Sequence, residues 1–220
     1  MPYQEERKEW VPRTQLGQRV VKGEFPSMEA LLAQGSLVLE PEIVDHLVPG
    51  LKEEVILIGG SPGKGGGAKR TPTRRTARMH KSGRRMKMTA MIAVGNGAGL
   101  FGLGKAGSRE NRIALQRALA AAKLAVVRVR LGCGSWECRC GGSHSIPFKV
   151  SGRSGSVRVK LLPAPKGVGI VASSEVKKML QLAGIKDVWA KLDGQTSTRI
   201  NLAQALFIAL KRLEQTKGGV

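Results

Sequence analysis

Four residues in one short segment carry side chains that bind soft metal ions. They are Cys133, Cys138, Cys140 and His144, in LGCGSWECRCGGSH. Three thiolates and one imidazole suit a tetrahedral zinc ion. The C-x-x-x-x-C-x-C-x-x-x-H spacing differs from the common zinc-finger spacings, and three reduced cysteines in a loop can also stay without a metal. The segment therefore predicts one structural zinc, with an unliganded loop as the alternative.

The same segment disfavours two other chemistries. Zinc deaminases carry H-x-E and P-C-x-x-C elements, and the sequence has neither, so a catalytic zinc of that kind is not expected. The chain has three cysteines, an odd number in one cluster, which is unlike the disulfide framework of a secreted domain. A reducing cytosol is the expected compartment.

Glycine-rich motifs give no nucleotide site. Two overlapping G-x-G-x-x-G matches begin at Gly97 and Gly102, but they span a predicted turn and strand where the dinucleotide fingerprint needs a strand and then a helix. Residues 58–65 imitate a phosphate-binding loop, yet Ile58 replaces its first glycine and Gly65 replaces its Ser or Thr. Paired carboxylates and a credible catalytic triad are also absent from the sequence, so we expect a protein that is not an enzyme.

The charge of the chain is divided unevenly along its length. The 220 residues include 37 Lys and Arg against 16 Asp and Glu, a net charge of +21. Residues 1–60 have six basic and ten acidic side chains, whereas residues 61–109 have twelve basic and none acidic. Such a segment repels itself unless a polyanion neutralises it. Only eight residues are aromatic, so we expect nucleic-acid contacts to phosphate and shape more than base stacking.

Thirteen basic side chains are the predicted RNA contacts, and a solvated cationic surface is the alternative. They are Lys64, Lys69, Arg70, Arg74, Arg75, Arg78, Lys81, Arg84, Arg85, Lys87, Lys105, Arg109 and Arg112. The last six lie on one predicted hairpin and at the start of one predicted helix, so they could converge on a phosphate backbone.

The elements that position these residues are predicted from periodicity. Ser27 caps a short helix that Gly35 ends, and Pro41 opens a second one. Residues 59–78 have no apolar period, so we expect an extended basic loop that becomes ordered only against a partner. Residues 84–94 alternate as a half-buried strand, with Arg85 and Lys87 on its open face.

A turn at 95–97, a returning strand at 100–103 and a long helix capped by Ser108 complete a first α+β unit. A strand at 157–161, a helix at 176–183, a strand at 188–192 and a helix at 202–213 form a second unit. The predicted fold is α+β with two small domains. The predicted divisions are an acidic helical extension (1–60), a basic Gly/Pro-rich loop (61–80), an RNA-binding domain (81–130), a cysteine-containing link (131–150) and a C-terminal α+β domain (151–220).

Three segments resemble one known family. KSGRRMKMTAMIAVGNGAGLFGLGKAGSRENRIALQRALAAAK is similar to the N-terminal RNA-binding domain of the small-subunit ribosomal protein five family. SGSVRVKLLPAPKGVGIVASSEVKKMLQLAGIKDVWAKLDGQTSTRINLAQALFIALK resembles its C-terminal domain, and GCGSWECRCGGSHSIPFKV resembles the link of archaeal-type members. The resemblance implies a first domain related to the double-stranded-RNA-binding fold and a second with a β-α-β-α arrangement.

The resemblance also implies partners. It places residues 81–85 against small-subunit ribosomal RNA and maps the family's G-x-G-K-A stretch onto residues 102–106. It implies a position beside small-subunit proteins four and eight, near the channel through which messenger RNA enters, with effects on assembly, decoding accuracy and messenger RNA passage. Bacterial members lack the cysteine cluster, so a zinc would not be essential to the shared function.

The predicted function is that of a structural constituent of the small ribosomal subunit, cytoplasmic and ribosome-associated. The alternative is a non-ribosomal RNA chaperone or architectural RNA-binding protein. Charged residues stand where a secretory signal would be apolar, and no apolar run reaches the roughly 18 residues that a membrane span needs, so no membrane partner is expected.

Overall fold

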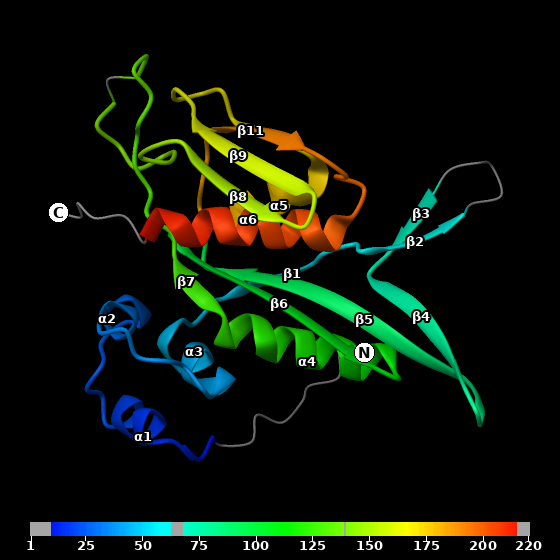
Figure 1. The fold of residues 1–220 in the computed structure, drawn as a ribbon. Helices are drawn as coiled ribbons and strands as arrows, with labels where there is room; N and C mark the ends of the chain where they lie inside the picture. The colour runs from blue at the N-terminus through cyan, green and yellow to red at the C-terminus, as the bar shows by residue number, and fades with distance from the viewer. Residues whose placement is uncertain (1–9, 63–67, 139, 215–220) are drawn as a thin grey trace, which may run out of the picture. The chain divides into compact units, whose positions relative to one another are not determined.

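The computed structural model describes residues 10–62, 68–138 and 140–214 (Figure 1). The chain divides into two compact units, Met1–Pro49 and Gly50–Val220, which are described separately below.

The first unit contains three short helices, α1 (Gln15–Val21), α2 (Met28–Ala33) and α3 (Pro41–Leu47). The Ser27 hydroxyl accepts a hydrogen bond from the Ala30 backbone N–H at the start of α2 (3.3 Å), and Pro41 occupies the first turn of α3. Both predicted helices are therefore confirmed. Leu31 and Ile43 are fully buried and form part of this unit's core.

The second unit begins with an antiparallel sheet in the order β1-β5-β6-β7, with β4 also paired to β5. Its strands are β1 (Lys52–Val55), β4 (Thr73–His80), β5 (Gly83–Gly95), β6 (Leu100–Ser108) and β7 (Val126–Arg128), and α4 (Asn111–Leu124) packs against β5 and β6. The predicted hairpin and helix are confirmed. Ser108 is not the helix cap, because it ends β6 opposite Met88 and Glu110 takes the N-cap position.

The close approach of α4 to the sheet depends on two glycines of β6. A Cβ at Gly104 would lie 2.2 Å from both the Ala118 carbonyl oxygen and the Ala122 amide nitrogen. A Cβ at Gly102 would lie 2.4 Å from the Ala122 carbonyl oxygen. Backbone therefore packs on backbone here, and any side chain would push the helix away.

The expectation of an irregular basic loop is wrong for the residues that the structure describes in this part of the chain. β2 (Gly59–Pro62) pairs with β3 (Ala68–Thr71), and β4 pairs with the first half of β5. Residues 74–80 are all exposed, so β4 needs no apolar alternation and leaves no periodic signal in the sequence. Backbone hydrogen bonds to β5, not buried side chains, define this strand.

The C-terminal part forms a four-stranded sheet in the order β10-β11-β9-β8. Its elements are β8 (Val150–Ser154), β9 (Val157–Pro163), β10 (Ile170–Val171), α5 (Ser174–Leu182), β11 (Val188–Asp193) and α6 (Arg199–Glu214). The two predicted strands and two predicted helices are confirmed, whereas β8 and β10 were not predicted. Gly152 in β8 lies against α6, where a Cβ would meet the Ala205 carbonyl oxygen at 2.0 Å.

One hydrophobic core joins the two larger sheets of this unit. Met91 and Phe101 of the first sheet belong to the same buried cluster as Val159 and Leu206 of the second. The Gly97 backbone N–H donates to the Leu182 carbonyl oxygen (2.9 Å), which joins the β5–β6 turn to the end of α5. The first sheet, which carries the basic hairpin, is therefore supported by the C-terminal elements.

We expect Gly104→Ala to lower the free energy of unfolding by about 3 kcal/mol, because the new methyl group meets helix backbone that cannot rotate away. Gly60→Ala is the matched control, since its Cβ would meet only the Arg70 Nη1 atom at 3.4 Å. Urea denaturation followed by circular dichroism measures both variants. Equal midpoints for the two variants would contradict the packing argument.

Candidate nucleic-acid interface and metal centre

The basic hairpin of β4 and β5 is the first candidate site. Thr73–His80 pairs with Gly83–Ala90, and Lys81 and Ser82 form the turn at its end (Figure 1). Every residue from 74 to 82 is exposed. The hairpin therefore presents its side chains to a partner and not to the core.

The register of the hairpin places cations on both of its faces. Residues directly opposite one another share a face, and neighbours along a strand point to opposite faces. Arg78 is opposite Arg85 on one face, and Met79 is opposite Arg84 on the other. The hairpin therefore has a second cationic face, which carries Arg84, in addition to the predicted face of Arg85 and Lys87.

The cations of the hairpin are available to a partner anion. Opposed like charges such as Arg78 and Arg85 destabilise a strand pair. Among the described residues, no ion pair joins a cation of β4 or β5 to a carboxylate, and the Arg85 guanidinium donates to the Ser82 hydroxyl (3.1 Å). The arrangement favours contact with a polyanion such as a nucleic-acid backbone.

The remaining predicted contacts are spread along the sheet. Lys105 is exposed on β6 and lies opposite Met91 of β5. Met91 is four residues after Lys87, so the backbones of these two β5 residues are about 13 Å apart along the strand. Arg109 and Arg112 flank the start of α4, and Arg112 already has an interaction within the protein. The Lys87 ammonium lies 3.4 Å from the Cβ position of Gly107, two residues from Lys105 on β6. Convergence of these cations on one phosphate backbone stays a prediction.

Two predicted contacts lie on β3 of the β2–β3 hairpin. Arg70 of β3 is exposed, and Lys69 belongs to the same strand. Lys64 lies outside the described residues. Thr73, at the start of β4, donates a hydroxyl hydrogen bond to the Asn111 side-chain oxygen (3.1 Å), which ties the base of the basic hairpin to α4.

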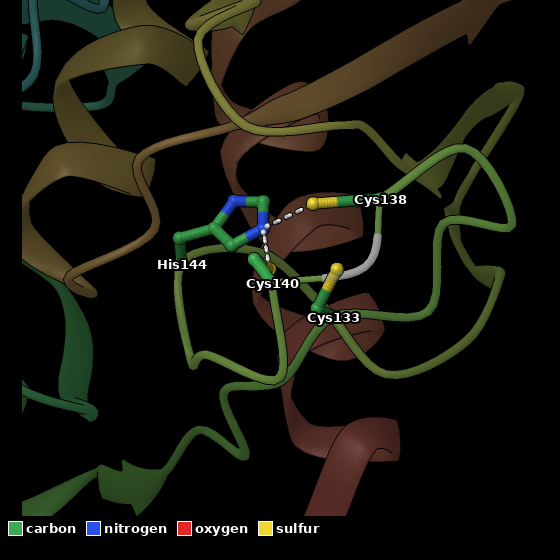
Figure 2. Close-up of side chains that lie close together, drawn as sticks. All are labelled: Cys133, Cys138, Cys140 and His144. Carbon is green, nitrogen blue, oxygen red and sulfur yellow. Dashed lines mark hydrogen bonds between the residues drawn. The ribbon is translucent and has the colours of Figure 1, made fainter.

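The second candidate site is the cysteine and histidine cluster in the link between β7 and β8. The backbone groups of Gly132 and Ser145 exchange hydrogen bonds of 2.9 and 2.8 Å, which close the base of the loop. The ligand atoms of Cys133, Cys138, Cys140 and His144 all lie within 4.8 Å of one another. Figure 2 shows the His144 ring directed at the sulfur atoms of Cys138 and Cys140.

The donor set fits a tetrahedral metal ion. The His144 Nε2 atom is 3.1 Å from the Cys140 sulfur and 3.6 Å from the Cys138 sulfur. Ligand atoms about 2.0–2.3 Å from a tetrahedral zinc are separated by about 3.3–3.8 Å, so only small adjustments are required. The predicted ligands are thus brought together, and the cluster could hold a metal.

A carboxylate outside the loop orients the histidine. Asp187 Oδ2 lies 2.7 Å from His144 Nδ1, and both residues are buried. Burial opposes ionisation of Asp187, but hydrogen bonds from the Gly169 amide, the His144 ring and the Gly167 amide together lower its pKa. An ionised Asp187 keeps the proton on Nδ1 and leaves Nε2 free to bind a metal.

The thiols influence one another's ionisation. A hydrogen bond with the Cys140 thiol, together with one from the Lys166 backbone, lowers the pKa of Cys138 to about 6. Burial, together with hydrogen bonds to Cys140 and Cys138, raises the pKa of Cys133 to about 11. The protein alone therefore stabilises the Cys138 thiolate, and a bound divalent cation would stabilise that of Cys133.

Two residues of this site were missed in the sequence. Asp187 is 43 positions from His144, and no local spacing indicates that the two meet. Gly134 lies so close to the returning chain that a Cβ would be 2.0 Å from the Pro147 carbonyl oxygen. A glycine one position after the first cysteine is a signal that could have indicated a close backbone approach.

Comparison with known proteins identifies two matching domains. Residues 152–218 match the family described as ribosomal protein S5, C-terminal domain, and residues 72–130 match ribosomal protein S5, N-terminal domain. No helix in the described part of the chain is both long and apolar enough to cross a membrane.

Several archaeal proteins, each named small ribosomal subunit protein uS5, are similar over nearly the whole chain. The protein of Methanothermobacter thermautotrophicus is 45% identical over 209 residues, which cover 95% of this chain and 90% of the relative. That of Thermofilum pendens is 46% identical over 207 residues, covering 94% and 95%. That of Methanospirillum hungatei is 44% identical over 214 residues, covering 97% of both.

We expect Asp187→Asn to weaken zinc binding by the cluster about 10- to 100-fold, because the histidine loses the charged partner that fixes its ring. Asp193→Asn is the control, since Asp193 is half-exposed and its carboxylate faces Lys160 at 3.2 Å, on β9. Titration of the purified protein with zinc against a chromophoric chelator measures both variants. Equal zinc affinities would show that Asp187 does not support the cluster.

Proposed function

We propose that this chain, which belongs to the ribosomal protein S5 family and is a structural constituent of the small ribosomal subunit, holds ribosomal RNA with the basic hairpin of β4 and β5. The observation that carries the proposal is a hairpin exposed over residues 74–82 and 84–87, with cations on both faces and no carboxylate from residue 61 to residue 109. Contacts of this kind neutralise phosphates whatever the base sequence.

Membership of the family indicates the classes of partner. A small-subunit protein of this family binds ribosomal RNA and neighbouring ribosomal proteins. We propose further that the neighbours are small-subunit proteins four and eight, near the channel through which messenger RNA enters, and that the acidic helices of residues 1–49 face protein. The ribosome would then place the chain in the cytoplasm.

The relatives also bear on the alternative function and on catalysis. The relatives named above are ribosomal proteins, and nothing in the comparisons supports the alternative of a free RNA chaperone. The family is one of ribosomal structural proteins, and the expectation that this chain carries no catalytic activity stays a prediction.

We propose that the metal of the cysteine and histidine cluster is a structural zinc. Cys133, Cys138, Cys140 and His144 would hold it, and its role would be to fix the link between the two matched domains. The set of three sulfur atoms and one ring nitrogen, with a carboxylate behind the histidine, is typical of such sites.

We expect the double variant Arg78→Gln and Arg85→Gln to bind purified small-subunit ribosomal RNA more weakly. The plot of log affinity against log salt should become shallower by about 1.8, since two phosphate contacts are lost. Lys191→Gln with Lys211→Gln is the control, because both lysines are exposed on C-terminal elements outside the hairpin. Fluorescence anisotropy at several salt concentrations gives the slopes, and identical slopes for the two double variants would refute the assignment.

The protein on salt-washed small subunits should contain one zinc per chain. Cys138→Ser should lose the metal, while Trp136→Ala should keep it, because Trp136 is 91% exposed in the same loop and offers no ligand. Elemental analysis by mass spectrometry measures the zinc. A wild-type protein without zinc, isolated under reducing conditions and without chelators, would contradict the proposal.

A further inference from the structure

A cavity of about 620 Å³ lies where β2, β3 and β4 approach the start of α6. Figure 1 shows the β2–β3 hairpin beside the base of β4. Arg74 and Arg75 line the cavity from β4, and Ser197 and Thr198 line it from the segment before α6. All of its lining residues belong to the second unit. The cavity lies beside the start of β4, whereas Arg78 lies toward the end of the same strand.

The cavity favours an anionic ligand. The described residues that line it include no Asp or Glu. Its third arginine, Arg199, is already engaged, because its Nη1 atom donates to Glu175 Oε1 (2.7 Å) and to the Leu57 carbonyl oxygen (2.9 Å). Arg75 is opposite Met88 in the β4–β5 register and shares its face, whereas Arg74 belongs to the other face of β4. Arg75 therefore supplies the guanidinium group that a ligand beside Met88 could use.

Charge is only part of the lining. Ile58, Met88 and Ile200 supply an apolar surface, and Ser197 and Thr198 supply hydroxyl groups. The hydroxyls of Thr71 and Thr73 already donate to the Thr73 carbonyl oxygen and to Asn111. Small-ligand sites have volumes of about 300–1,000 Å³ and combine apolar walls with a few polar groups. A free phosphate would leave the apolar surface without a contact. A nucleotide has a phosphate for the guanidinium group, a flat base for the apolar surface, and polar atoms on its base and sugar that can hydrogen-bond to the hydroxyl groups of the cavity.

We propose that this cavity holds one unpaired nucleotide of RNA, with its phosphate on Arg75 and its base against Ile58, Met88 and Ile200. The inference rests on the proposed function, because ribosomal RNA would supply the nucleotide from a bulge or loop. Bases that leave the helix in such places are the parts of RNA that proteins hold individually. The hairpin would then bind phosphates along a backbone, and the cavity would fix one position of it.

Methionine-methyl NMR of the full chain tests the proposal, with AMP, GMP, CMP and UMP as probes and inorganic phosphate at the same ionic strength as the reference. The Met88 methyl signal should shift and saturate with a nucleotide. Met79 and Met86 are 73% and 43% exposed at the outer end of the hairpin and serve as internal controls. Shifts of equal size at all three methyl groups, or a Met88 shift that phosphate reproduces, would overturn the proposal.

A matched pair of variants tests the arginine. Arg75→Gln should weaken nucleotide binding about tenfold, the effect of losing one charge-assisted hydrogen bond. Arg117→Gln removes the same charge from an exposed position on α4 and should leave the affinity unchanged. Equal losses in the two variants would show general electrostatic attraction and no nucleotide site.

The two proposals can fail separately. If Arg78 and Arg85 control the salt dependence of RNA binding while no nucleotide moves Met88, the cavity assignment is wrong and the hairpin assignment stands. If the nucleotides bind at Met88 while the hairpin variants bind RNA normally, the hairpin assignment is wrong. If neither effect is seen, both are wrong.

Discussion

The close contact between α4 and β6 is the constraint on which the exposed part of this protein depends. The two glycines of β6 let the helix backbone rest directly on the strand, which fixes β6 and, through the antiparallel ladder, β5. The outer half of β5 and all of β4 beyond Arg74 have no buried side chains of their own. The packed inner half of β5 therefore fixes the position of its outer half and, through strand pairing, that of β4.

This dependence explains how a segment with so much positive charge can form regular structure. Hydrogen bonds between the backbones of β4 and β5 define the hairpin, while the side chains repel one another across it. The link from Thr73 to Asn111 attaches the hairpin base to α4. RNA would neutralise the charges without having to build the strands, so little ordering entropy would be lost on binding.

An element could be predicted from the sequence where the residues that determine it are close together in the chain. The alternation over 84–94, the turn at Asn96 and the periodic helices gave the correct elements, and the family resemblance is confirmed by the matches over both domains. The strand β4 was missed because exposure on both faces removes the apolar period. Asp187 and the cavity between Arg74 and Ser197 were missed because both join residues that only the tertiary fold brings together.

The two halves of β5 differ in how they would tolerate a change of chain length during evolution. A one-residue insertion reverses the faces of all the following side chains. In the inner half, between Ala90 and Val94, every residue is buried, so such a reversal would exchange side chains between two packed interfaces. In the outer half both faces are cationic and exposed, so a reversal would conserve the character of each face. The outer hairpin can therefore vary in length where the inner sheet cannot.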